Sequence, residues 1–158
     1  MSRPQVGQPV PDFALEADDG TTVRLSDLRG QTVVLYFYPK DDTSGCTAEA
    51  CEFRDRDPDF RASGARVLGV SPDPLESHRR FRAKYGLDFT LLSDPDHRVA
   101  EAFGVWVEKS MYGRRYMGVE RSTFVIGPDG ALVQALYKVK PKGHAAEVLD
   151  LVGAPAAQ

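Results

Sequence analysis

The sequence predicts an α/β fold, a central mixed β-sheet flanked by helices, in one domain that spans residues 1–158. The first observation is a pair of apolar stretches, 32–38 and 65–70, whose residues do not alternate with polar ones, as is typical of strands covered on both faces. The second is that helix-start signals follow each of these stretches. The third is a Gly-Pro-Asp-Gly turn at 127–130 between two apolar stretches, which indicates an antiparallel hairpin.

The N-terminal segment predicts an extension of this sheet. Residues 1–12 are rich in proline and favour an extended backbone. Residues 13–25 predict a β-hairpin that turns over Asp18-Asp19-Gly20. Residues 26–30 predict a short helical turn that glycine ends.

The strand at 32–38 is followed by a helix that we expect over residues 44–56. Thr43 is a suitable N-cap for it, because its side-chain oxygen can accept a hydrogen bond from a free amide of the first turn. The dipeptide Asp57-Pro58 predicts an interruption, since the residue before a proline avoids helical angles.

The strand at 65–70 leads into a second helix with clear start signals. Asp73 is the expected N-cap and Pro74 the first helical residue, and Glu76 stands where a capping box places its acidic residue. This helix is expected to end at Gly86.

The remaining elements complete a known order. We expect a short strand at 90–92, a helix over 94–104, and a loop or loose hairpin at 105–119 that lies over the functional site. We then expect a hairpin of strands 122–126 and 131–137, and a helix at 143–151 before a tail of small residues. The order β–α–β and then ββα matches the thioredoxin-like fold, with the N-terminal hairpin and one helix–strand unit as additions.

Composition and charge exclude several classes of function. The chain has 20 basic and 23 acidic residues and a net charge of −3, without a basic stripe for nucleic acid or a basic amphipathic helix for membranes. The first ten residues lack the apolar core of a signal peptide, so we expect a cytoplasmic protein. The two cysteines and three histidines lack structural zinc spacing, so we predict no metal. We expect His78, His97 and His144 at the surface and assign them no role.

Cys46 is the residue from which a function can be argued. With Thr43 as N-cap, it is the third residue of its helix, where the amide N–H groups have no intrahelical partner. These amides and the helix dipole favour negative charge at the thiol. Such a cysteine is expected to exist partly as thiolate, the nucleophilic form.

Cys51 follows five residues later, in the same predicted helix. Five helical steps rise about 7.5 Å and rotate about 500°, which places the two Cα atoms roughly 8.6 Å apart on different faces. A disulfide needs about 4.4–6.8 Å. The two cysteines therefore cannot be bridged while the helix is intact, which favours a transient redox bridge over a structural one. The alternative is two ordinary free thiols.

The segment around Cys46 resembles a family signature. It contains proline, three residues, threonine, two residues and cysteine, at Pro39, Thr43 and Cys46. With the surrounding YFYPKDDTSGCTAEACEFRD and the stretches VLGVSPD, LLSDPD and KSMYGRRYMGVERSTFVI, the chain resembles the peroxiredoxins over most of its length. Within them it is most similar to the bacterioferritin-comigratory-protein or PrxQ branch.

The resemblance implies a role for six residues. They are a peroxidatic cysteine, Cys46; a resolving cysteine, Cys51; two residues that bind peroxide, Thr43 and Arg121; a proline that shields the site, Pro39; and an acidic residue that orients the arginine, Glu49. One departure is Ser44, where the family usually has proline; this bears on how rigid the first turn is.

Plainer roles remain open for three of these residues. Thr43 could serve only as a helix cap. Arg121 could be a surface arginine paired with Glu120 or Glu49. Glu49 could be a solvated helix residue.

The resemblance implies a thiol-dependent peroxidase that reduces hydrogen peroxide and organic hydroperoxides without metal or organic cofactor. A sulfenic acid on Cys46 would condense with Cys51, and a thioredoxin-type protein would reduce the disulfide. Such proteins are often monomers, and we expect a monomer here.

Three alternatives stay open. A general thiol–disulfide oxidoreductase is disfavoured, because the chain has C-x-x-x-x-C in place of C-x-x-C. A binding or chaperone module with incidental cysteines, and a peroxide sensor with the same chemistry, are the others.

Overall fold

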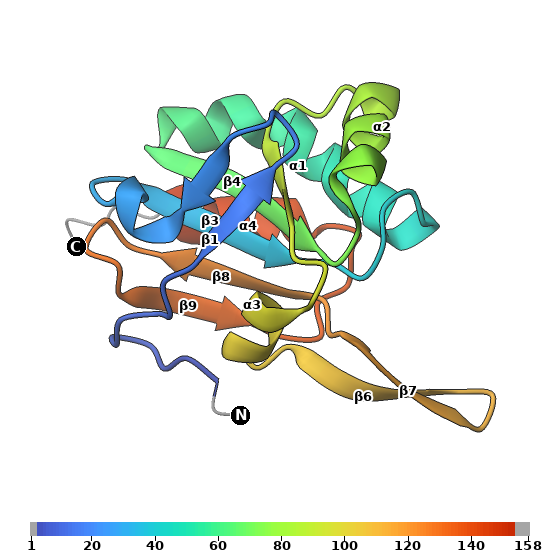
Figure 1. Cartoon of the computed structure of the whole chain (residues 1–158). Coiled ribbons are helices and arrows are strands. Elements are labelled where there is room, and N and C mark those ends of the chain that lie inside the picture. Colours follow the sequence, from blue (N-terminus) through green and yellow to red (C-terminus); the bar gives the residue numbers. More distant parts are fainter. Residues whose placement is uncertain (1–2, 154–158) are drawn as a thin grey trace.

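The computed structural model describes residues 3–153 and has an α/β architecture built on a seven-stranded mixed sheet (Figure 1). Its strand order is β2-β1-β5-β4-β3-β8-β9. Its strands are β1 (Ala14–Ala17), β2 (Thr22–Arg24), β3 (Thr32–Phe37), β4 (Ala65–Ser71), β5 (Thr90–Ser93), β8 (Ser122–Ile126) and β9 (Leu132–Leu136). The helices are η1 (Leu25–Leu28), α1 (Ser44–Ala62), α2 (Leu75–Tyr85), α3 (Arg98–Ala102) and α4 (His144–Gly153). The predicted thioredoxin-like fold is confirmed.

Strand β3 lies inside the sheet and leads directly to Cys46. It pairs parallel to β4 and antiparallel to β8, so both of its edges are occupied. Leu35 and Phe37 point into one buried cluster, and Val34 and Tyr36 point into another. The missing alternation in the sequence therefore reflects burial on both faces, as predicted.

Both faces of the sheet are covered. On one face, α1, α2 and α4 contribute Phe53, Phe81 and Val148 to the cluster that contains the even-numbered residues of β3. On the other face, η1 and α3 contribute Leu28 and Val99 to the cluster of the odd-numbered residues. The N-terminal hairpin extends the sheet as predicted, because β1 pairs antiparallel with both β2 and β5.

The predicted interruption of the cysteine helix at Asp57-Pro58 is wrong. Helix α1 continues through Pro58 to Ala62. Phe53 and Phe60, on either side of the proline, are fully buried, and Asp57 forms an ion pair with Arg61 one turn on, at 2.8 Å. Tertiary packing of this kind supplies most of a helix's stability, which explains why it overrides the local preference.

Two predicted helix starts are also corrected. Helix α2 begins at Leu75 without a side-chain cap, and the Asp73 carboxylate instead accepts hydrogen bonds from the Asp41 amide and the Ser71 hydroxyl, both at 2.7 Å. Helix α3 begins only at Arg98. The buried Asp94 carboxylate caps it from a distance, by accepting hydrogen bonds from the amides of Val99 and Ala100.

The segment at 105–119, for which we expected a loop or loose hairpin, contains a β-hairpin that forms a separate two-stranded sheet. Strands β6 (Trp106–Met111) and β7 (Arg114–Val119) pair only with each other among the described residues, and their tip stands away from the main sheet (Figure 1). Tyr112 and Gly113 both have positive φ, 53° and 79°, as a two-residue hairpin turn requires. The hairpin alternative is therefore confirmed.

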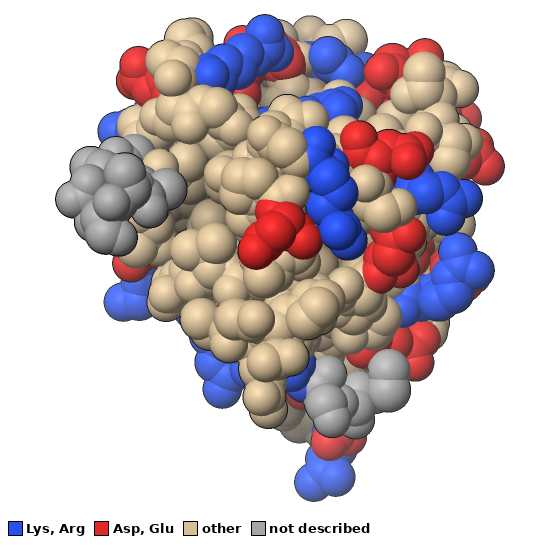
Figure 2. Space-filling view, turned by 90° about the vertical axis from the view of Figure 1, so that its left-hand side faces the viewer, with Lys and Arg blue, Asp and Glu red and all other residues tan. Residues whose placement is uncertain are grey.

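The surface agrees with the charge balance of the sequence. Lysine and arginine side chains are interspersed with aspartate and glutamate on the face in Figure 2. Among residues 3–153, no helix is long and apolar enough to cross a membrane. The predicted C-terminal tail after α4 and the first two residues of the predicted extended segment lie outside the described residues.

Candidate active site

Cys46 lies between the end of strand β3 and the body of helix α1. The loop 38–43 follows β3, and α1 begins at Ser44, so Cys46 is in the first turn and is only 1% exposed. Thr43 is the N-cap by backbone position, but its hydroxyl donates to the Lys40 carbonyl at 3.0 Å and does not cap the helix. The amides of the first turn are therefore left without a side-chain cap and favour negative charge beside the thiol.

Arg121, in the short connection between β7 and β8, brings a cation to the thiol. Its Nη2 lies 3.1 Å from Cys46 Sγ, and its Nη1 donates to Glu49 Oε1 at 2.6 Å. Burial alone would lower the pKa of Arg121, but the charges of Glu49 and Cys46 outweigh it and raise the pKa above its usual value. The guanidinium is therefore cationic beside the thiol, and with 15% of its side chain exposed it is not a surface arginine.

Glu49 is the buried partner of this arginine. Its side chain is 0% exposed, which rules out the solvated-residue alternative. Burial raises the pKa of Glu49 to about 7, although Arg121 opposes the shift. Its Oε2 has no hydrogen-bond partner within residues 3–153. The carboxyl group therefore changes its charge near neutral pH, one helical turn from Cys46.

Gly45 allows these groups to approach. A Cβ atom at this position would lie 3.3 Å from Pro141 Cγ and 3.4 Å from Arg121 Nη2. A larger residue would therefore press on the guanidinium that contacts the thiol.

Cys51 lies farther along α1 and is half-buried, and both cysteines are free thiols. The intact helix with two free thiols is what the sequence predicts for the reduced protein. A continuous helix keeps residues five apart on different faces, so a 46–51 bond requires local unwinding.

The other predicted site residues lie in the loop 38–43, which leads to Cys46. Pro39 is half-buried at the end of β3, and Thr43 and Ser44 are exposed at the start of α1. Lys109 of β6 is close enough for charges at the site to act on it: burial lowers its pKa most, Arg121 lowers it further, and Cys46 opposes the shift. The middle of the hairpin thus lies near the charges of the site, and its tip stands away from the main sheet (Figure 1).

The expectation that the histidines are surface residues is wrong for two of them. His144 is 2% exposed, its Nε2 lies 2.7 Å from Thr123 Oγ1, and burial lowers its pKa. His78 is 0% exposed and hydrogen-bonded on both ring nitrogens. The spacing of His78 with Phe81 and Tyr85, three and seven residues on, places it on the inner face of α2 and could have indicated this.

This arrangement suits attack by sulfur on a polarised bond. The helix N-terminus and the guanidinium of Arg121 both place positive potential beside Cys46 Sγ. The same donors can hold negative charge as it moves from sulfur to a leaving oxygen. The site therefore supports nucleophilic chemistry on a small electrophile that can reach a buried thiol.

Comparison with known sequences finds a matching family model and similar proteins. A sequence model described as the AhpC/TSA family matches residues 6–135. The chain is 52% identical to peroxiredoxin Bcp of Bacillus subtilis over 146 residues, which covers 92% of this chain and 93% of that protein.

Comparison with solved structures finds similar folds among proteins of the same type. The bacterioferritin comigratory protein of Xanthomonas campestris, described in terms of alkyl peroxide reduction and trapped intermediate and ligand complexes, superposes with a TM-score of 0.89 at 44% identity, covering 95% of this chain and 98% of that one. A cysteine-to-serine variant of PrxQ from Xylella fastidiosa superposes with a TM-score of 0.92 at 43% identity and 98% coverage of both chains.

Proposed function

Because the chain belongs to the AhpC/TSA family, as a peroxiredoxin of the Bcp/PrxQ type and hence a thiol-dependent peroxidase, we propose that Cys46 is its peroxidatic cysteine and Cys51 its resolving cysteine. The observation that carries the proposal is the contact of Arg121 with Cys46 Sγ at 3.1 Å, in the first turn of a helix without a side-chain cap.

In the first step, the Cys46 thiolate attacks one oxygen of the hydroperoxide. The S–O bond forms as the O–O bond breaks, and the second oxygen takes up a proton and leaves as water or an alcohol. The guanidinium of Arg121, the first-turn amides and the Thr43 hydroxyl hold the charge that moves onto the leaving oxygen. Pro39 shields the thiol from bulk water, and Glu49 orients Arg121.

In the second step, Cys51 attacks the sulfenic sulfur of Cys46. An S–S bond forms and water leaves, without further net oxidation, because the protein already gave up two electrons to the peroxide in the first step. Because α1 is continuous over both cysteines, its first turns must unwind before the sulfurs meet.

A thioredoxin-type dithiol protein would then reduce the disulfide by thiolate attack. The 1% exposure of Cys46 in the intact helix supports an order in which a protein reductant reaches the sulfur only after α1 has opened. Turnover needs a compartment that supplies reduced dithiols, and we therefore propose a cytoplasmic location.

We propose hydrogen peroxide and organic hydroperoxides as substrates. The alkyl peroxide reduction described for the Xanthomonas campestris relative supports the organic class. We also propose that the monomer is active, because both cysteines, Arg121 and Glu49 come from one chain.

The test compares three forms of the protein in a peroxide-consumption assay with a thioredoxin system as reductant. Cys46→Ser is expected to abolish consumption. Cys51→Ser is expected to react once, to give a sulfenic acid, and then to stop turning over with thioredoxin. Peroxide consumption by Cys46→Ser at the wild-type rate would refute the assignment. Insulin reduction at a rate comparable with peroxide reduction would favour a general oxidoreductase.

A further inference from the structure

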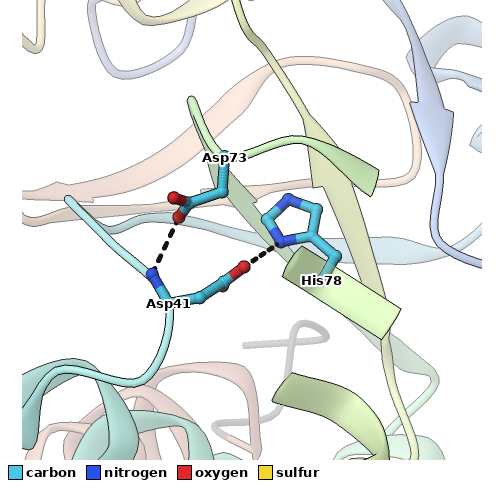
Figure 3. Close-up of side chains that lie close together, drawn as sticks. All are labelled: Asp41, Asp73 and His78. Atoms are coloured by element: carbon cyan, nitrogen blue, oxygen red, sulfur yellow. Dashed lines mark hydrogen bonds and ion pairs between the residues drawn. The ribbon is translucent and has the colours of Figure 1, made fainter. Parts of the chain in front are cut away.

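The loop 38–43, which carries the chain from β3 to the helix of Cys46, is fastened to residues outside the site. Asp41 is only 7% exposed, and its amide donates to Asp73 Oδ2, beyond the end of β4, at 2.7 Å (Figure 3). Helix α2 contributes His78, which faces the Asp41 carboxylate in the same view. The backbone just before Cys46 is thus tied to two other elements.

The Asp41 carboxylate has three side-chain neighbours that can donate to it. The Tyr38 hydroxyl donates to Oδ1 at 2.5 Å. The Ser77 hydroxyl donates to Oδ2 at 2.8 Å, and His78 Nδ1 lies 2.7 Å from the same oxygen. Burial raises the pKa of Tyr38 well above its usual value, so Tyr38 acts only as a neutral donor.

The hydrogen-bond partners of His78 locate its protons. Nε2 lies 2.9 Å from the Leu92 carbonyl oxygen, which can only accept, so Nε2 carries a hydrogen. A carboxylate surrounded by donors is itself best satisfied as an acceptor, which places a second hydrogen on Nδ1. The two side chains are then joined by a short, buried hydrogen bond from Nδ1 to Oδ2.

Asp41, Asp73 and His78 are also close enough together to share a metal ion. Each candidate ligand atom already has a protein partner, however: His78 Nδ1 and Asp41 Oδ2 face each other, and Asp73 Oδ2 accepts from an amide and from the Ser71 hydroxyl. The cluster therefore fits a hydrogen-bonded anchor better than a metal site.

The same helix holds the next residue of the loop. Asp42 has a φ of 60°, in the left-handed region, and its carboxylate accepts from the Tyr85 hydroxyl at 2.7 Å and from Lys84 Nζ at 2.8 Å. Two consecutive loop residues are therefore attached to α2, and the more buried attachment is the one to His78.

We propose that His78 is a positioning residue for the peroxide step, which holds Asp41 and thereby fixes Pro39 and Thr43 around Cys46. The proposal rests on the proposed role of Cys46. Arg121 reaches the sulfur from the β7–β8 connection, independently of this loop. Loss of the anchor should therefore slow the reaction with peroxide, which the loop residues must hold, more than the intrinsic reactivity of the thiol.

Two substitutions at His78 separate its hydrogen bonds. In His78→Asn the amide nitrogen takes the place of Nδ1, so a donor to Asp41 is kept and the contact with Leu92 is lost. In His78→Gln the amide nitrogen takes the place of Nε2, so the contact with Leu92 is kept and the donor to Asp41 is lost. The measured quantities are the single-turnover rate of Cys46 oxidation by hydrogen peroxide and the rate of Cys46 alkylation by iodoacetamide.

We expect His78→Gln to lower the peroxide rate at least about tenfold, because displacements on the order of 1 Å can cost about a hundredfold. The alkylation rate of His78→Gln should stay within about twofold of the wild-type rate. The peroxide rate of His78→Asn, which keeps the donor to Asp41, should stay within about threefold of the wild-type rate. Equal peroxide rates in the two variants, or a parallel fall of both rates in His78→Gln, would overturn the proposal.

Two further variants complete the design. Arg80→Ala, on the exposed side of α2, is the matched control and should behave as wild type. Ser77→Ala removes another donor from Asp41 Oδ2 at a half-buried position, so it keeps the proposal testable if His78→Gln does not fold. It should lower the peroxide rate but not the alkylation rate. An unchanged peroxide rate would count against the anchor. A wild-type protein whose Cys46 does not react with peroxide would refute the proposed function instead.

Discussion

At the scale of single residues, the guanidinium of Arg121 does two things at once. One nitrogen faces Cys46 Sγ, and the other donates to the buried Glu49. This two-pronged geometry is available to arginine but not to lysine, whose ammonium is a point charge on a flexible stem.

Arg121→Lys is therefore expected to lower the rate of Cys46 oxidation by about a hundredfold or more, because the loss of one preorganised donor costs about 2.7–4 kcal/mol in comparable sites. Stopped-flow kinetics with hydrogen peroxide would measure it. Arg115→Lys, at an exposed arginine of β7, is the matched control, and an equal effect of the two substitutions would contradict the assigned role.

Glu49 makes the stability of the protein depend on pH. Its pKa rises from 4.5 to about 7 on burial, so between these values the folded chain keeps a proton that the unfolded chain has released. The free energy of unfolding therefore falls as pH rises through this window, by about 3 kcal/mol in total for this group.

Glu49→Gln cannot titrate and should lack this contribution. We expect urea unfolding to show that wild type loses stability relative to the variant between about pH 4.5 and pH 8, with most of the change complete by about pH 7, because linkage acts only between the two pKa values. Parallel pH profiles for the two proteins, or a relative gain in wild type, would show that burial does not dominate the pKa of Glu49.

Residues whose role follows from local sequence could be predicted, and those whose role depends on distant partners could not. The place of Cys46 in a first helical turn was predicted with Thr43 as N-cap, and the backbone bears this out although the Thr43 hydroxyl donates to Lys40. The burial of His78 depends on Asp41, which lies 37 residues away in the chain. Sequence spacing alone indicated only that His78 shares a helix face with Phe81.

At the scale of elements, α1 combines a stable body with a reactive start. Phe53 and Phe60 are fully buried and fix its later turns. Its first turn has no side-chain cap, and Thr43 and Ser44 are exposed. If α1 opens as we propose, opening should therefore begin at its N-terminal end.

We predict that oxidation exposes the backbone only at this end. Hydrogen–deuterium exchange of the peroxide-treated protein should show faster exchange at 46–51 than in the reduced protein, with exchange at 53–60 unchanged. Cys51→Ser treated in the same way should keep the pattern of the reduced protein. Uniform loss of protection along α1 would contradict local opening.

Strand positions could be predicted more completely than helix ends. β3 and β4 are apolar over most of their length, apart from Thr32, Arg66 and Ser71, so burial on both faces could be predicted from the sequence. Helix ends were misplaced where a buried contact decided them, as with Phe60 beyond Pro58 and with the Asp94 carboxylate that caps α3. Local preferences carry no information about such long-range contacts.

At the scale of the whole molecule, the parts of the proposed active site stand on separate elements around the sheet. Cys46 stands on the helix after β3, and Arg121 stands on the connection into β8, the strand that pairs with β3. His78 anchors the intervening loop from α2. Opening of the first turns of α1 would therefore break the contacts of Arg121 with Cys46 and Glu49 while leaving the pairing of β3 with β8 in place.

An intact-mass measurement tests most directly whether Cys46 is the peroxidatic cysteine. Reduced protein is mixed with one equivalent of hydrogen peroxide, quenched with a thiol alkylator and weighed, and its peptides are then mapped. We expect the rapid loss of two hydrogens and a linkage between Cys46 and Cys51. A mass that shows only two alkylated thiols would contradict it, because Cys46 would then not be a peroxidatic cysteine. A gain of oxygen without linkage would remove Cys51 from the mechanism.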